Sequence, residues 1–171
     1  DEVREHGTLP VDLFDTYSSI MSLGEMLNVN AESLSVDAPY LAINDKVIAP
    51  TVVNQAHRPL KIGLFWRSND RLDDHTACHL SEFISLTENL PASFFSLQPT
   101  TFAAERELLA KHNINNLAQG ITTYSQAGAL MQQMDLIVTV TAPIAHLSGA
   151  LALPTLVLAP YQLDWQWADT D

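Results

Sequence analysis

This sequence has little cysteine, few basic side chains and no long apolar run. Its one cysteine, Cys78, excludes an internal disulfide and a cysteine-rich zinc site. Eight Lys and Arg stand against 20 Asp and Glu, which gives a formal net charge of −12. Because phosphate neutralisation requires a basic surface, this balance excludes general affinity for nucleic acid or anionic membranes. No apolar stretch approaches the roughly 20 residues that a membrane helix needs, so we expect no membrane insertion and a cytoplasmic location.

Several sharp sequence signatures are also missing. The chain has no Gly-x-Gly-x-x-Gly and no Gly-x-x-x-x-Gly-Lys-[Ser/Thr], which excludes dinucleotide and P-loop sites that carry these signatures. It has no Gly-x-Ser-x-Gly, the nucleophile elbow of serine hydrolases. His75 and His79 have the i, i+4 spacing of metal ligands on a helix, but no Glu lies between them. We therefore predict neither a metal site nor a cofactor.

The sequence does contain enough apolar residues for a core, and its charges are unevenly distributed. Hydrophobic residues make up 47% of the chain, which excludes global disorder. Nine acids and two bases fall within residues 1–50, whereas four of the eight bases, Arg58, Lys61, Arg67 and Arg71, fall within 14 residues. In an otherwise anionic chain this cluster is where an anionic ligand is tolerated. Ordinary surface charges are the equally weighted alternative.

Short apolar runs alternate with amphipathic segments from residue 61 onward. We expect strands at residues 61–66, 93–97, 135–140 and 155–158. We expect helices at 79–90, 101–112, 125–133 and 143–151, with Thr101 capping the second helix and Glu105 in its first turn. Strands that alternate with helices predict right-handed crossovers and an α/β fold, in which helices cover both faces of a parallel sheet.

Residues 1–58 have a different character. Apolar positions between 13 and 27 predict a helical stretch that Gly24 interrupts. Residues 38–59 contain three prolines and no steady period, which is typical of a linker. We therefore divide the chain into a helical and linker segment, residues 1–58, and an α/β domain, residues 59–171. Since the sequence starts at Asp1 rather than Met, we expect it to be part of a longer chain.

Two strand ends are candidate binding positions. In a parallel sheet, ligands bind outside the carboxyl ends of the strands, beside helix N-termini whose dipole favours a phosphate. The first position is the loop 67–71, and the second is the turn 141–143. His146 lies one turn into the helix that follows. It either reaches a ligand oxygen or is a buried histidine bonded to a backbone carbonyl.

Several segments of the chain occur in the same order in a known family. They are KIGLFWRSN at 61–69, FSLQ at 95–98, MDLIVTV at 134–140, AHLSGAL at 145–151, Pro154, Pro160-Tyr161 and DWQW at 164–167. With these segments the chain resembles the carboxy-terminal half of bacterial GT-B glycosyltransferases akin to the heptosyltransferase family. It is most similar to the branch that is commonly attached to tetratricopeptide repeats and resembles O-linked N-acetylglucosamine transferases. Residues 19–23 and 38–41 resemble that branch's stretch between its two lobes.

The resemblance implies a Rossmann-like lobe that binds the nucleotide of a nucleotide-sugar donor. An amino-terminal lobe of the parent chain then holds the acceptor and the general base, so that no catalytic residue is assigned in this chain. An acceptor hydroxyl attacks the anomeric carbon, and the departing diphosphate is stabilised electrostatically. The donor-binding residues that the resemblance and the strand ends indicate are Trp66, Arg67, Ser68, Asn69, Arg71, Gln98, Thr141, Ala142, Pro143 and His146.

Three positions depart from the family pattern. Residues 141–142 read Thr-Ala where an Asp-Thr or Asp-Ser pair is usual, and Thr76 stands where an Arg or Lys is common. Residues 99–100 read Pro-Thr where a Lys or Gly is common. Because the chain lacks these polar groups of the family, the alternative is a degenerate, non-catalytic lobe that serves as a binding or scaffolding module. We expect the isolated chain to be inactive.

Overall fold

The computed structural model describes residues 15–30, 37–52, 60–68, 78–88, 90–161 and 167. Contacts within the chain divide it into two compact units, Asp1–Val36 and Asp37–Asp171. The second unit holds the sheet and starts earlier than residue 59, where the sequence pattern places the start of the α/β domain. The reason is that residues 37–52 pack against the helices of this unit through backbone and side-chain contacts.

The first unit contains one short helical region among its described residues. A 3-10 helix, Ile20–Ser22, runs directly into α1, Leu23–Met26. The predicted helix at 13–27 is therefore too long: residues 15–19 are not helical, and residues 13 and 14 lie outside the described residues. Gly24 lies inside α1 and does not interrupt it. No residue of α1 is buried, so tertiary packing does not offset the cost of nucleating a longer helix.

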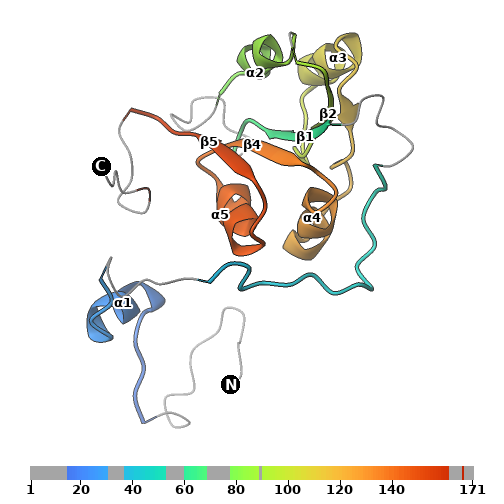
Figure 1. Cartoon of the computed structure of the whole chain (residues 1–171). Helices are drawn as coiled ribbons and strands as arrows, with labels where there is room; N and C mark the ends of the chain where they lie inside the picture. Colours follow the sequence, from blue (N-terminus) through green and yellow to red (C-terminus); the bar gives the residue numbers. More distant parts are fainter. Residues whose placement is uncertain are drawn as a thin grey trace. The chain divides into compact units, whose positions relative to one another are not determined.

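The described residues of the second unit form a sheet of five parallel strands (Figure 1). In their order across the sheet, the strands are β3 (Asn115–Asn116), β2 (Ala92–Ser96), β1 (Leu60–Phe65), β4 (Leu136–Val140) and β5 (Thr155–Leu158). The register places Ile62 of β1 beside Phe94 of β2 and Leu136 of β4. This arrangement confirms the predicted α/β fold and has a Rossmann-like strand order.

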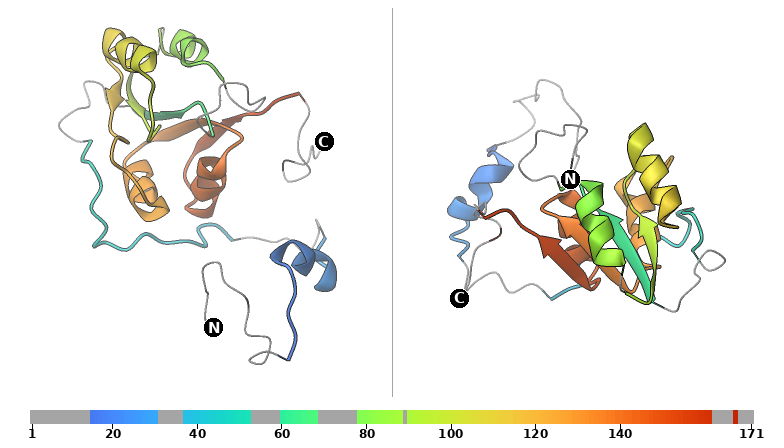
Figure 2. Two further views of the ribbon diagram at one scale, coloured as in Figure 1. Left: turned by 180° about the vertical axis from the view of Figure 1, so that it is seen from behind. Right: turned by 90° about the horizontal axis from the view of Figure 1, so that it is seen from above.

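Four of the described helices cover the sheet, two on each face (Figure 1 and Figure 2). The helices α2 (Leu80–Thr87) and α3 (Ala103–Lys111) lie on one face, and α4 (Tyr124–Met131) and α5 (Pro143–Ala150) lie on the other. The chain moves outward from β1 to β3 and then returns to β4 on the other side of β1. The sheet therefore has a topological switch point between β1 and β4. Within the described ranges, no helix is long and apolar enough to cross a membrane.

The buried core explains why these apolar runs form strands. Ile62, Phe95 and Ile137 are at most 2% exposed, as expected for strands that are covered on both faces. Gly63 is required where β1 passes Leu97, because a Cβ at position 63 would lie 2.6 Å from Leu97 Cδ1. The centre of the sheet is therefore packed closely enough to hold the strand ends in defined positions.

Two local features differ from the expectation based on sequence. The strand β3 consists of two asparagines, so no apolar run marks it, and the pattern does not predict it. The helix α3 has Phe102 rather than Thr101 as its cap residue. The Phe102 N–H donates to Glu105 Oε2 at 2.7 Å, which satisfies a donor at the helix start without a hydroxyl cap.

Candidate functional site

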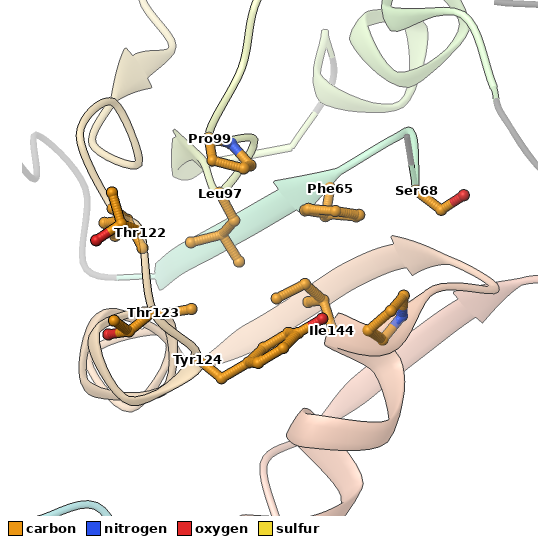
Figure 3. A pocket seen from close by; sticks show the side chains of 11 residues that line it. Phe65, Ser68, Leu97, Pro99, Thr122, Thr123, Tyr124 and Ile144 are labelled. Atoms are coloured by element: carbon orange, nitrogen blue, oxygen red, sulfur yellow. The ribbon is translucent and has the colours of Figure 1, made fainter. Parts of the chain in front are cut away.

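A pocket of about 480 Å³ opens at the carboxyl edge of the sheet, at the switch point between β1 and β4 (Figure 3). Its walls come from the ends of β1 and β2, from the loop 121–123 and from the starts of α4 and α5. The lining residues are Phe65, Ser68, Leu97, Pro99, Ile121, Thr122, Thr123, Tyr124, Ala127, Pro143 and Ile144. The pocket thus lies where ligands bind in open α/β sheets.

The lining of this pocket is mostly apolar. Phe65 and Leu97 lie on one side of it, and Tyr124 and Ile144 lie on the other (Figure 3). Hydroxyl groups of Ser68 and two threonines add polar contacts. Among the lining residues that the structure describes, none is charged. The pocket therefore suits a neutral ring system with a few hydrogen-bonding groups.

The amino terminus of α5 adjoins this pocket and is not capped by its own side chains. Its N-cap residue, Ala142, has no side-chain acceptor, and Pro143 follows at the first helical position. The start of α4 differs, because Thr123 Oγ1 accepts the Gln126 N–H at 3.2 Å and Gln126 Oε1 accepts the Thr122 N–H at 3.1 Å. Of these two helix starts, that of α5 is therefore the one suited to an anionic group.

Three buried oxygens at the strand ends have no hydrogen-bond partner among the described residues, and one of them, Asn116 Oδ1, belongs to β3. Thr141 Oγ1 follows β4, directly before the N-cap of α5, and Gln98 Oε1 follows β2. Gln98 is 3% exposed, and its Nε2 donates to the backbone oxygen of Arg67 at 3.1 Å. An unpaired buried polar group costs about 1–3 kcal/mol. Each oxygen is therefore suited to a hydrogen bond from a ligand or from water.

Trp66 and Arg67 lie in the interior and are not among the lining residues. Trp66 Nε1 donates to Glu105 Oε1 at 2.8 Å, and Arg67 Nη2 lies 3.0 Å from Glu105 Oε2. The Arg67 guanidinium also lies 4.4 Å from the centre of the Phe102 ring and donates to the Thr100 oxygen at 3.1 Å. Through these contacts the charge of Arg67 is paired within the protein, and the end of β1 is joined to α3.

Of the remaining candidate residues, some line the pocket, Thr141 and Ala142 directly precede the lining residue Pro143, and others are not described. Ser68 and Pro143 line the pocket, at the two strand ends that the sequence pattern indicates. Asn69 and Arg71 lie outside the described residues, as does Thr76. The structure therefore brings Ser68 and residues 141–143 to one edge of the sheet.

His146 is exposed on α5 and stacks on Trp167, with the ring centres 4.7 Å apart and the planes at 29°. The interpretation of His146 as a buried histidine is therefore wrong. The side chain is not among the residues that line the pocket. It lies on the helix whose amino terminus adjoins the pocket, one turn beyond Pro143.

Sequence reasoning missed two parts of this site. One is the loop 121–124, which forms a wall of the pocket. Its signal is Thr122-Thr123 directly before an apolar-periodic helix, which marks a helix start. The other is Glu105, whose place in a first helical turn predicts capping but gives no indication that it binds Trp66 and Arg67.

Cys78 and Glu82 form a hydrogen-bonded pair at the start of α2, in which the thiol donates to Glu82 Oε2 at 2.8 Å. Partial burial, followed by this hydrogen bond and the charge of Glu82, raises the pKa of Cys78 to about 12. The bond from the thiol lowers the pKa of Glu82. The protonated thiol is a poor nucleophile and metal ligand. No group of three potential metal ligands occurs in the described ranges, and His75 lies outside them.

No known protein family, curated protein or solved structure matches this chain. Its fold and pocket define a Rossmann-like α/β domain with a cavity at the switch point of the sheet. Because folds of this class host many activities, the residues around that cavity decide which function is best supported.

Proposed function

We propose that the second unit is the donor-binding lobe of a GT-B glycosyltransferase. It binds a nucleotide diphosphate-sugar, whose sugar passes to an acceptor hydroxyl. The observation that carries this proposal is the position of the pocket, at the switch point and beside the uncapped amino terminus of α5. Parallel α/β sheets bind nucleotides at such positions. Of the segments that resemble the family, 61–69 contains the lining residues Phe65 and Ser68, and 145–151 continues α5, whose amino terminus adjoins the pocket.

The chemistry of the lining indicates which part of the donor binds at each position of the site. The neutral pocket, with Phe65 and Tyr124 on opposite sides, takes the nucleoside. The diphosphate lies against the start of α5, where the helix dipole and the hydroxyl of Thr141 meet its oxygens. The same groups stabilise the negative charge that develops on the diphosphate as it leaves the anomeric carbon.

Transfer of the sugar also needs a general base that accepts the proton of the acceptor hydroxyl. We assign no base in this chain, because in the family that it resembles the base belongs to the acceptor lobe. The proposal therefore includes an acceptor lobe and tetratricopeptide repeats in the parent protein. It also includes a cytoplasmic location for the protein.

One observation favours a second function, that of a degenerate binding or scaffolding module. Arg67, a candidate phosphate ligand, is buried in an ion pair with Glu105, and no described residue of the lining is basic. The overall charge of −12 also opposes the approach of a diphosphate. A module of this kind binds a neutral group in the pocket and transfers nothing.

Ligand-induced stabilisation of the full chain distinguishes the two functions. UDP-, GDP- and ADP-linked sugars are titrated while Tm is measured, and the free nucleosides form a second series. A ligand at hundredfold excess over its Kd stabilises the folded state by about 2.7 kcal/mol. Stabilisation by a nucleotide sugar supports the donor lobe, and stabilisation by nucleosides alone supports the module. The donor-binding proposal fails if no nucleotide sugar raises Tm.

A substitution at Thr141 tests the role of the helix start. Thr141→Val removes the buried hydroxyl and nearly keeps the shape of the side chain. We expect roughly tenfold weaker binding of the donor, as when a hydrogen bond to a charged group is lost. The matched control is Thr87→Val at the carboxyl end of α2, where Oγ1 donates to the Ile84 oxygen at 2.7 Å. Equal affinities of the two variants would remove Thr141 from the site.

A further inference from the structure

Residues 37–52, which we call the strap, have neither helix nor strand and follow the ends of α5 and α4 that lie away from the pocket (Figure 1 and Figure 2). The first attachment is at Ala150, the last residue of α5. The N–H groups of Tyr40 and Leu41 both donate to its backbone oxygen, at 3.0 and 3.1 Å. The last carbonyls of a helix accept no hydrogen bond from within that helix. The two N–H groups of the strap therefore supply donors for the Ala150 carbonyl.

The second attachment is a close approach of the strap to Gly128 in α4. A Cβ at position 128 would lie 2.6 Å from Ile43 Cδ1 and 3.1 Å from Ile43 Cγ1. Carbon atoms that are not bonded pack at about 3.5–4.0 Å, so a side chain does not fit between them. The glycine therefore lets the strap lie directly on the helix.

The third attachment is at Gln133, two residues beyond α4. Its Nε2 donates to the Pro50 oxygen at 2.9 Å, and its Oε1 accepts the Val52 N–H at 3.0 Å. Val52 is 1% exposed and belongs to the hydrophobic core. The strap is thus held by both helices and by the core of the unit.

The same two helices line the pocket with their opposite ends. Tyr124 and Ala127 lie in the first turn of α4, and Pro143 and Ile144 lie in the first turn of α5. A helix of this length is about 12 Å long and moves as a stiff body. Because the interior is closely packed, a shift at the carboxyl end of either helix displaces the wall of the pocket.

We propose that the strap sets the spacing of α4 and α5 and thereby the width of the pocket, so that displacement of the strap changes ligand binding at the switch point. The strap begins at Asp37, where the second unit begins. It is therefore the covalent route by which the preceding part of the chain acts on the pocket. This inference is independent of the proposed glycosyltransferase activity, since it holds for any ligand of the pocket.

Hydrogen exchange of the full chain, followed by mass spectrometry without ligand, tests the proposal. Gly128→Ala places a methyl group 2.6 Å from Ile43 Cδ1 in the strap and 3.2 Å from Leu151 Cδ1 at the end of α5, while alanine itself favours the helix. We expect the contact with Ile43 to push the strap away. We expect roughly tenfold faster exchange at Tyr40 and Leu41, equivalent to the loss of one or two hydrogen bonds, and faster exchange in residues 121–127. The matched control is Gly149→Ala in α5, where no atom from the described residues outside the backbone of that helix lies within 4 Å of the added Cβ. We expect the exchange rates of Tyr40, Leu41 and residues 121–127 to be unchanged in this control.

A second variant separates release of the strap from a local effect at position 128. Gln133→Ala removes the bonds to Pro50 and Val52, together with the longer bond of 3.2 Å to the Ala129 oxygen in α4, and leaves Gly128 intact. Faster exchange of the strap together with residues 121–127 in both variants supports the proposal. Faster exchange of the strap alone overturns it, as does faster exchange of residues 121–127 in Gly128→Ala only. Unchanged exchange of the strap in both variants overturns it too, because these contacts then do not hold the strap.

Discussion

Arg67 and Glu105 form an ion pair inside the second unit, with Arg67 Nη2 3.0 Å from Glu105 Oε2. The two residues are 1% and 9% exposed. The pair joins the end of β1 to the first turn of α3, and Trp66 donates a further hydrogen bond to the same carboxylate. A buried ion pair of this kind is costly to break, because removal of one partner leaves a charge in the interior.

Loss of the carboxylate should strongly destabilise the fold. We expect Glu105→Ala to lower the free energy of unfolding by about 3–5 kcal/mol, since the charge of Arg67 remains buried. Urea denaturation at equilibrium measures this change. The control is Glu107→Ala, an exposed acid on the same helix, for which we expect a change of about 0.5 kcal/mol or less. Similar losses in the two variants would contradict the structural role of the pair.

The close approach of β1 to Leu97 makes Gly63 intolerant of a side chain. We expect Gly63→Ala to destabilise the protein by about 1–3 kcal/mol, because the added methyl group would lie 2.6 Å from Leu97 Cδ1. The comparison is Gly149→Ala, where the space around the added methyl group is open. That substitution should be neutral or stabilise by up to about 1 kcal/mol, because alanine favours a helix. The urea midpoints of the two variants should therefore move in different directions or by clearly different amounts.

The Cys78 thiol should react slowly with alkylating reagents in the folded protein. Burial and the bond to Glu82 raise its pKa from 9.0 to about 12, so at pH 8 the thiolate fraction is about a thousandfold lower than in the unfolded chain. Iodoacetamide labelling with and without urea measures this ratio. Glu82→Gln removes the negative charge beside the thiol and should accelerate labelling of the folded protein. An unchanged rate in that variant would leave burial as the whole cause.

The same pKa shift predicts how stability depends on alkaline pH. The folded protein holds the thiol proton up to about pH 12, whereas the unfolded chain releases it near pH 9.0. The stability that depends on the neutral Cys78 is therefore fully present below pH 9 and is lost as the pH rises toward 12. Cys78→Ala should reduce the slope of the unfolding free energy against pH in this window. An identical slope would contradict the prediction.

The exposed His146 provides a test of the proposed donor site at the start of α5. We expect His146→Ala to weaken binding of the nucleotide sugar by roughly tenfold, through loss of one hydrogen bond to a charged group. Isothermal titration calorimetry measures this change. The matched control, His112→Ala, lies at the carboxyl end of α3 and should leave the affinity unaltered. If His146→Ala has the affinity of the unaltered protein, His146 does not belong to the site.

Most of the sheet can be predicted from apolar runs. The strands β1, β2, β4 and β5 lie within one residue of the predicted ranges, because buried parallel strands need continuous apolar sequence. The strand β3 cannot be found in this way. Asn115 and Asn116 pair with β2 through their backbone, and their side chains give no apolar signal.

The predicted helix at 13–27 shows a different limit of sequence patterns. Its apolar positions have helical spacing, yet helical structure covers only residues 20–26 of the part that is described. Tyr17, Ile20 and Leu27 are each at least 70% exposed. An amphipathic pattern becomes a long helix only where another surface covers its apolar face.

The sequence predicted the edge of the sheet at which the pocket lies, but it did not predict the side-chain contacts there. Pro143 of the turn 141–143 and Ser68 both line the pocket because the carboxyl ends of parallel strands meet at one edge of the sheet. The burial of Arg67 in an ion pair could not be predicted from the sequence. Its carboxylate partner, Glu105, lies 38 residues away in sequence, and a base that follows a strand gives no sign of whether it faces solvent or the interior.

The sequence by itself determined an acidic α/β protein with a parallel sheet, because composition and hydrophobic periodicity are properties of local sequence. Tertiary structure alone decided that Arg67 is neutralised by Glu105 and that residues 37–52 lie against both helices. Each of these outcomes depends on contacts between residues that are far apart in the chain. Arg67 is the clearest case, since only the fold shows that this base is used inside the protein rather than at its surface.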